Sequence, residues 1–116
     1  LVWPEDRPLF VRVSATDWLP GGFSPEDAVV FARELKALGC DAVDCSSGGL
    51  TPESHPDIYG RMYQVPFADR VRNEAGIVTM AVGNITEIQS TGPRASGAVM
   101  RSAWALQRDI AGLSAL

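Results

Sequence analysis

The order of the apolar segments constrains the fold of this chain more than any other feature. Residues 9–14 alternate apolar and polar side chains, residues 41–46 are typical of a second short strand, and residues 77–82 are almost wholly apolar. In the two segments between them, apolar residues recur at the spacing of a helix. Strand, helix, strand, helix, strand with short returns is typical of a parallel sheet with right-handed crossovers. The sequence therefore predicts a parallel α/β fold.

The clearest helix signal begins at Ser24. Ser24 can cap free backbone amides, Pro25 suits the first helical position, and the two acids that follow complement the helix dipole. Gly39 is placed to end this helix in a left-handed conformation. Between them an apolar stripe recurs at helical spacing. The stripe consists of Ala28, Phe31, Ala32, Leu35 and Leu38.

The second helix is predicted from Pro66 to about Glu74. Phe67 and Val71 are expected to point inward, and Gly76 is expected to end the helix. Two prolines in residues 51–63 predict an irregular segment before it. Beyond the third strand, the spacing allows a further helix at about residues 99–110.

Composition excludes several classes of protein. The 116 residues suffice for one small domain, and 14 acids against 10 bases argue against a nucleic-acid or anionic-membrane surface. No apolar run is long enough to span a bilayer, and the first residues lack the features of a signal peptide, so we expect a cytoplasmic protein. One histidine, His55, and two cysteines, Cys40 and Cys45, predict buried thiols and no metal site.

Three strands are fewer than half of those in an eight-stranded barrel, which typically needs about 250 residues. Alone they would leave apolar strand faces and edges exposed to water. We therefore expect a partial (β/α)8 TIM barrel, with about three parallel strands and two connecting helices.

Ligands of parallel α/β folds collect at the carboxyl ends of the strands. All three predicted strands end in polar or glycine-rich sequence, and their starts do not. The sequence therefore places a candidate site at this end of the sheet. The side chains concerned are Arg12, Ser14 and Asp17, then Asp44, Ser46 and Ser47, then Gly83 and Asn84.

Arg12 is the residue whose two possible roles differ most. It lies on the strand face opposite Val11 and Val13, where a permanent cation needs a partner. The pattern fits a ligand-binding cation and an internal ion pair with Asp44 equally well. The Gly83-Asn84 step also allows two interpretations, backbone amides for a phosphate or an ordinary turn.

Other candidates at the strand ends favour structural roles. Residues 46–49 lack the Gly-x-Ser-x-Gly pattern of a nucleophile and predict a hydrogen-bonded turn. Alternation places Cys45 toward the helices, which argues against a redox thiol. His55 is expected to be exposed. Tyr59, Tyr63 and Gln64 could line a pocket, or the tyrosines could cover the edge of the core.

Four motifs in register resemble the Old Yellow Enzyme family. They are PLFVRVSATDW at 8–18, DAVDCSSG at 41–48, YQVPFA at 63–68 and AVGNI at 81–85. The likeness is strongest to the bacterial ene-reductases, the NADPH dehydrogenases. Residues 60–64 and 72–74 are also similar to the reductase-like C-terminal part of bifunctional salicylyl-CoA or anthraniloyl-CoA monooxygenases.

The resemblance implies a flavoprotein oxidoreductase that holds FMN at the carboxyl ends of a TIM barrel. NAD(P)H would reduce the flavin, which would pass a hydride to an activated alkene or similar small acceptor. Arg12 matches the arginine beside flavin N1 and the C2 carbonyl. Gly83 and Asn84 match the loop at the FMN phosphate, and Ser46, Ser47 and Gly48 match a segment near the cofactor.

The resemblance covers about residues 1–87, which would be the C-terminal portion of an FMN-binding barrel. Residues 88–116 form a divergent tail that lacks the family's eighth-strand pattern. No phosphate contact is therefore transferred to Arg94, Arg101 or Arg108.

The leading hypothesis is an FMN-dependent NAD(P)H oxidoreductase present as a fragment. A homo-oligomer is one assembly that the sequence allows. The alternative is a non-catalytic, truncated remnant that folds only by association. A third candidate, a phosphate-binding aldolase or isomerase barrel, would need a catalytic lysine at a strand end. The one lysine, Lys36, lies on the first predicted helix instead.

Overall fold

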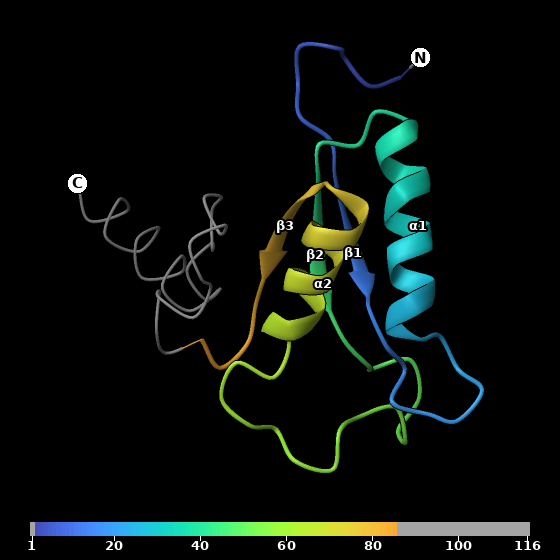
Figure 1. The fold of residues 1–116 in the computed structure, drawn as a ribbon, viewed down its shortest axis with the longest axis vertical. Coiled ribbons are helices and arrows are strands. Elements are labelled where there is room, and N and C mark those ends of the chain that lie inside the picture. The colour runs from blue at the N-terminus through green and yellow to red at the C-terminus, as the bar shows by residue number, and fades with distance from the viewer. Residues whose placement is uncertain (1, 86–116) are drawn as a thin grey trace.

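The computed structural model describes residues 2–85 and has a three-stranded parallel sheet with two helices. The strands run in one direction and the helices return in the other (Figure 1). The sheet order is β1-β2-β3. The elements are β1 Phe10–Ser14, α1 Pro25–Ala37, β2 Ala42–Ser46, α2 Val65–Ala75 and β3 Val78–Ala81. The predicted parallel α/β fold is confirmed.

The tail at 88–116 lies outside the described residues, together with its predicted helix at 99–110 and its three arginines. Each strand is one or two residues shorter than predicted, and residues 9, 41, 77 and 82 lie outside the strands. Residues 51–63 contain no helix or strand, as predicted.

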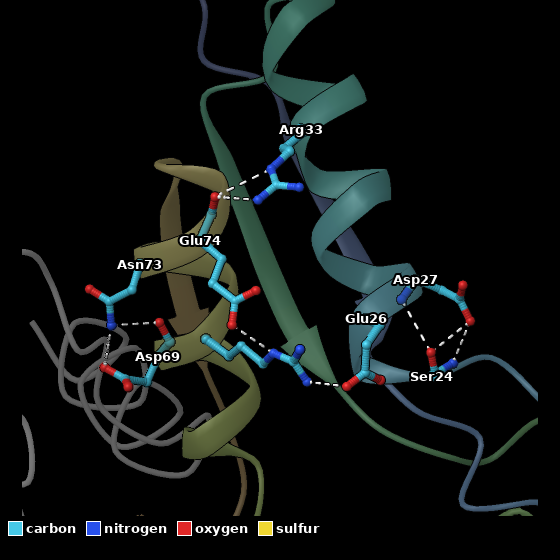
Figure 2. Close-up of polar contacts among 8 residues, drawn as sticks. Ser24, Glu26, Asp27, Arg33, Asp69, Asn73 and Glu74 are labelled. Atoms are coloured by element: carbon cyan, nitrogen blue, oxygen red, sulfur yellow. Dashed lines mark hydrogen bonds and ion pairs between the residues drawn. The ribbon is translucent and has the colours of Figure 1, made fainter.

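Helix α1 begins as its sequence predicts. The Ser24 hydroxyl accepts a hydrogen bond from the Asp27 backbone N–H at 3.2 Å, and the Asp27 carboxylate accepts from the Ser24 backbone N–H at 2.9 Å (Figure 2). This reciprocal capping box satisfies two amides that the first turn leaves without partners. Gly39 follows the C-cap with φ of 92°, the left-handed conformation expected there.

The predicted apolar stripe of α1 is correct in part. Ala28 and Ala32 are buried, and Leu35 packs against the core. Val29 is also buried, so the inward face is centred between residues 28 and 32. Phe31 lies roughly a quarter turn from that centre and is exposed. Leu38 is 82% exposed because it is the C-cap residue, beyond the last turn.

Helix α2 begins one residue earlier than predicted, and its N-cap is Gln64. Val71 is buried and Phe67 is half-buried, as expected. Gly76 ends the helix with φ of 67°. The two helices pack against each other, and Arg33 of α1 donates to the carbonyl of Glu74 in α2 at 3.0 Å (Figure 2).

The sheet has two chemically different faces. The register pairs Val43 of β2 with Val11 on one side and Thr79 on the other, and the side chains of this face pack against the helices. On the other face, Asp44 of β2 is paired with Arg12 on one side and Met80 on the other. No described helix covers this second face, which we call the open face, and Phe10 and Val78 are 54% and 48% exposed on it.

Candidate functional site

The loops that follow the strands gather at one end of the sheet (Figure 1). There the end of β1 is tied to the start of the β2–α2 loop. Ser14 donates its hydroxyl hydrogen to the Gly48 carbonyl at 3.0 Å, and the Gly48 N–H donates to the Thr16 carbonyl at 2.8 Å. A side chain at position 48 would collide with the Ser54 carbonyl, so glycine is required at this close approach.

Arg12 lies on the open face and is paired with Asp44 on the neighbouring strand. One guanidinium nitrogen, Nη1, is 3.1 Å from Asp44 Oδ2, and the other, Nη2, donates to Ser46 Oγ at 3.2 Å. The ion pair predicted as one alternative is therefore present. The Arg12 side chain is nevertheless 59% exposed, and these bonds use two of its five N–H groups.

Asp44 is only partly satisfied by this pair. Its second carboxylate oxygen, Oδ1, is buried and has no hydrogen-bond partner among residues 2–85. A buried acceptor without a partner is unusual in proteins and often marks a place that another polar group occupies. The open face therefore presents, side by side, a cation with spare donors and an acceptor without a donor.

Gln64 connects the ends of β2 and β3. Its Oε1 accepts hydrogen bonds from Ser46 Oγ at 3.3 Å and Ser47 Oγ at 2.9 Å, and its Nε2 donates to the Val82 carbonyl. The sequence suggests only that this residue could line a pocket, and it does not indicate the bridging role. Its position, with no side-chain cap bond to α2, is the structural signal for that role.

Gly83 and Asn84 form the turn after β3. Gly83 has φ of 93°, and a Cβ there would lie 2.9 Å from Gln64 Nε2, so the glycine permits the close approach of Gln64. Asn84 has φ of 50°, and its carbonyl accepts from the Met62 N–H at 3.0 Å. Its side-chain amide donates to the carbonyls of Tyr59 and Gly60 at 3.4 Å.

Tyr63 belongs to the same polar group. Burial raises the pKa of its hydroxyl, Tyr59 adds to the rise, and the positive charge of Arg12 opposes it. The Tyr59 and Tyr63 rings meet edge to face, with centroids 5.3 Å apart. The influence of Arg12 on Tyr63 places the cation and the β2–α2 loop in one electrostatic environment.

Other predicted candidates do not join this group. Asp17 accepts from the Phe23 N–H at 2.8 Å and organises its own loop. Cys45 is buried on the helix side, where desolvation, reinforced by Asp44, raises the thiol pKa to about 12. Its thiolate is therefore scarce near neutral pH, which argues against a redox role. His55 is exposed, as predicted.

Within the part of the chain that the structure describes, no cluster of three or more potential metal ligands is present. The same residues contain no helix whose length and apolar character would allow it to cross a membrane.

The chain is similar to bacterial NADPH dehydrogenases, although no family model matches it. It is 51% identical over 85 residues to the NADPH dehydrogenases of Listeria monocytogenes serotype 4a (strain HCC23) and Geobacillus thermodenitrificans (strain NG80-2). It is 48% identical to that of Geobacillus sp. (strain WCH70). These matches cover 73% of this chain but 24% of each relative.

The chain thus spans about a quarter of the length of the curated relatives it matches. Half of the aligned residues are nevertheless identical, in relatives from two genera that carry the same name. Over these 85 residues the chain is therefore a homologue of the NADPH dehydrogenases, which is consistent with a fragment of the Old Yellow Enzyme family that its four motifs resemble.

Proposed function

We propose that this chain forms one side of an FMN site in an NADPH-dependent oxidoreductase. The observation that carries the proposal is Arg12, a half-exposed cation held on the open face of a parallel sheet by two hydrogen bonds, one of them to Ser46 at the carboxyl end of β2. The names of the relatives support NADPH as the reductant. The four family motifs support FMN as the cofactor.

The donor set on the open face suits a flavin. Bound FMN would supply hydride transfer between NADPH and an acceptor such as an activated alkene. Arg12 offers its remaining N–H donors and its charge to the N1 and C2 carbonyl region, where negative charge develops on reduction. The Asp44 and Ser46 contacts hold the guanidinium in place in advance, so little reorganisation is needed when that charge appears.

The other end of the cofactor is assigned to the turn after β3. We assign the phosphate to the backbone at Gly83 and Asn84, since glycine lets a ligand approach the main chain closely. Ser47 and Gly48 lie between the two contacts, at the end of β2, and would line the cofactor. The whole site would lie on the uncovered side of the sheet, as the interior of a barrel requires.

The test is to place the 85 matched residues of this chain in the full-length Geobacillus thermodenitrificans enzyme, in exchange for the segment they match. The exchanged enzyme should bind FMN and oxidise NADPH. Arg12→Met should slow flavin reduction by roughly a hundredfold, since it removes the donor that faces the developing charge. A colourless exchanged enzyme that leaves NADPH untouched contradicts the proposal.

Arg33→Met is the matched control. Arg33 is also an exposed arginine with a hydrogen bond to a neighbouring element, but it lies on α1 and contacts α2. Its replacement should leave both FMN binding and NADPH oxidation unchanged. Equal losses in the two variants would show a general effect of charge or stability and would contradict a specific role for Arg12.

One observation favours the alternative, a non-catalytic chain that folds only by association. Phe10 and Val78 expose large apolar surface on the open face, and such surface favours contact with more protein. Light scattering on the purified 116-residue chain separates the two ideas. A well-folded monomer at micromolar concentration contradicts the association hypothesis, whereas obligate association without FMN binding supports it.

A further inference from the structure

We propose that Gln64 is a positioning residue that fixes the end of β2 and the turn after β3 in one geometry, and through Ser46 also fixes the guanidinium of Arg12. This inference rests on the proposed function, because it concerns how the two assigned ends of the FMN site are held relative to each other. It adds a role for a residue that contacts neither end of the cofactor in that assignment.

The burial of Gln64 is the first observation. Its side chain is polar, yet the residue is only 3% exposed. A buried amide is costly unless both its carbonyl and its NH₂ group find partners. It is the N-cap residue of α2, but its side chain forms no cap bond to that helix. Its polar atoms are therefore directed away from its own helix.

The partners of Gln64 lie at the carboxyl ends of two different strands. The Val82 carbonyl can only accept a hydrogen bond, so the side-chain atom that meets it must be the NH₂ group. The remaining atom, Oε1, then faces the Ser46 and Ser47 hydroxyls, which can donate to it. The orientation of the amide is therefore fixed by chemistry, and the side chain joins β2 to the end of β3.

The hydrogen-bond network extends from Gln64 to Arg12, and each of its bonds donates in the same direction. A guanidinium can only donate, so the Ser46 oxygen accepts from Arg12 Nη2. The Ser46 hydrogen is then free to point toward Gln64 Oε1. Donation runs from Arg12 through Ser46 and Gln64 to the Val82 carbonyl, which lies next to Gly83. Such a chain of bonds polarises its members in one sense and resists reorientation of any one of them.

Packing reinforces the hydrogen bonds at the turn. A Cβ at Gly83 would lie 2.9 Å from Gln64 Nε2 and 3.3 Å from the Tyr63 ring, so the turn rests directly on these side chains. Displacement of Gln64 would thus move the turn and loosen Ser46 together. Sites of this kind need a supporting layer that holds the contact groups to within a fraction of an ångström.

The test uses the exchanged full-length enzyme and compares Gln64→Met with Thr79→Val. Methionine is close to glutamine in size but forms no strong hydrogen bond. The Thr79 hydroxyl is also buried, but it donates to the Ala68 carbonyl at 3.0 Å on the helix side of the sheet. FMN affinity is measured by fluorescence titration, and the midpoint potential of the bound flavin by reduction against a reference dye. Both are measured where circular dichroism shows folded protein.

Gln64→Met should weaken FMN binding by at least roughly tenfold and lower the midpoint potential, because Arg12 is no longer held beside the site. Thr79→Val should lower the unfolding temperature and leave affinity and potential unchanged. If Gln64→Met behaves like Thr79→Val, Gln64 is merely structural and the inference is overturned, while the proposed function stands. If the unaltered exchanged enzyme does not bind FMN, the proposed function fails first.

If the Gln64→Met variant does not fold, Gln64→Glu tests the positioning role instead. A protonated carboxylic acid supplies one donor and one acceptor and so replaces the amide, whereas a carboxylate cannot donate to the Val82 carbonyl. Burial should raise the pKa of the new acid. FMN affinity relative to the unaltered enzyme should therefore recover as the pH falls. A ratio that does not change with pH contradicts the positioning role.

Discussion

The two helices begin in different ways, although both carry a proline in the first turn. The N-cap of α1 is Ser24, whose side chain bonds to its own helix. The N-cap of α2 is Gln64, whose side chain forms no bond to its helix and bonds to the ends of two strands. The comparison shows that the same position in a helix can stabilise the element itself or organise a neighbouring site.

The start of α2 is held by other means. The Val65 N–H donates to the Met62 carbonyl at 2.9 Å, so a backbone turn leads into the helix. The buried face of α2 then anchors it, through Ala68, Val71 and Ala75. Most helical stability in proteins comes from such packing and not from local propensity. Helix α2 can therefore form without a side-chain cap, which leaves Gln64 available to the strand ends.

The largest expected effect is at Gly83. Both Gly83 and Gly39 have φ close to +90°, but a Cβ at Gly39 would meet no atom within 4 Å, whereas at Gly83 it would meet Gln64. Gly39→Ala should destabilise the chain by about 1–2 kcal/mol, the cost of a left-handed alanine. Gly83→Ala should cost about 3 kcal/mol, because overpacking adds to that strain. Urea unfolding of the 116-residue chain measures both.

A double-mutant cycle assigns the excess at Gly83 to its neighbour. In a Gln64→Ala background the contact is absent, so Gly83→Ala should cost no more than Gly39→Ala does. An excess that persists without Gln64 would mean that the turn is constrained by something else. That result would remove the packing argument for the role of Gln64.

The features of the two helix starts that depend on residues close together in the sequence could be predicted. Ser24, Pro25 and Gly39 act within a few residues of their own helix, and the structure confirms all three. The Arg12–Asp44 pair was also foreseen as an alternative, because alternation and parallel order place neighbouring strands in register. Patterns of period two and of helical spacing carry this information directly.

The role of Gln64 could not be foreseen in the same way. Its partners are 17 and 18 residues away in sequence, and they depend on how the irregular segment at 51–63 turns back toward the sheet. Leu38 was misplaced for a related reason, since helical spacing continues past the point where α1 ends. Where a feature depends on a loop or on the exact end of an element, local patterns are not sufficient.

The second prediction concerns the α1 cap. Ser24→Ala removes the hydroxyl that accepts from the Asp27 N–H and should destabilise the chain by about 1 kcal/mol. In the exchanged enzyme it should leave FMN affinity unchanged, because the cap is tied to no strand end. Urea unfolding and FMN titration on the same preparation check both expectations. A change in FMN affinity as large as that of Gln64→Met would contradict the difference in role between Ser24 and Gln64.

The smallest expected effect concerns the ion pair that joins the two helices near the start of α1. Arg70 of α2 bonds to Glu26 at 2.6 Å and to Glu74 at 2.8 Å. The hydrogen bond from Arg70 is the main cause that lowers the pKa of Glu26 below its usual value. A lowered carboxylate pKa in the folded state adds stability above the unfolded pKa, and this stability is lost as the pH falls through the folded pKa.

Glu26→Gln should therefore be less stable than the unaltered chain at about pH 6, and the difference should shrink at about pH 3, because the carboxylate of the unaltered chain loses its charge as the pH falls through its folded pKa. The difference should be small and should shrink further in about 1 M salt, since both partners face solvent and the pair is screened. Urea unfolding at the two pH values and two salt concentrations measures it. A difference that is as large at low pH or in high salt would show that Glu26 acts through packing instead of charge, and the ion pair would then contribute nothing to the contact between the helices.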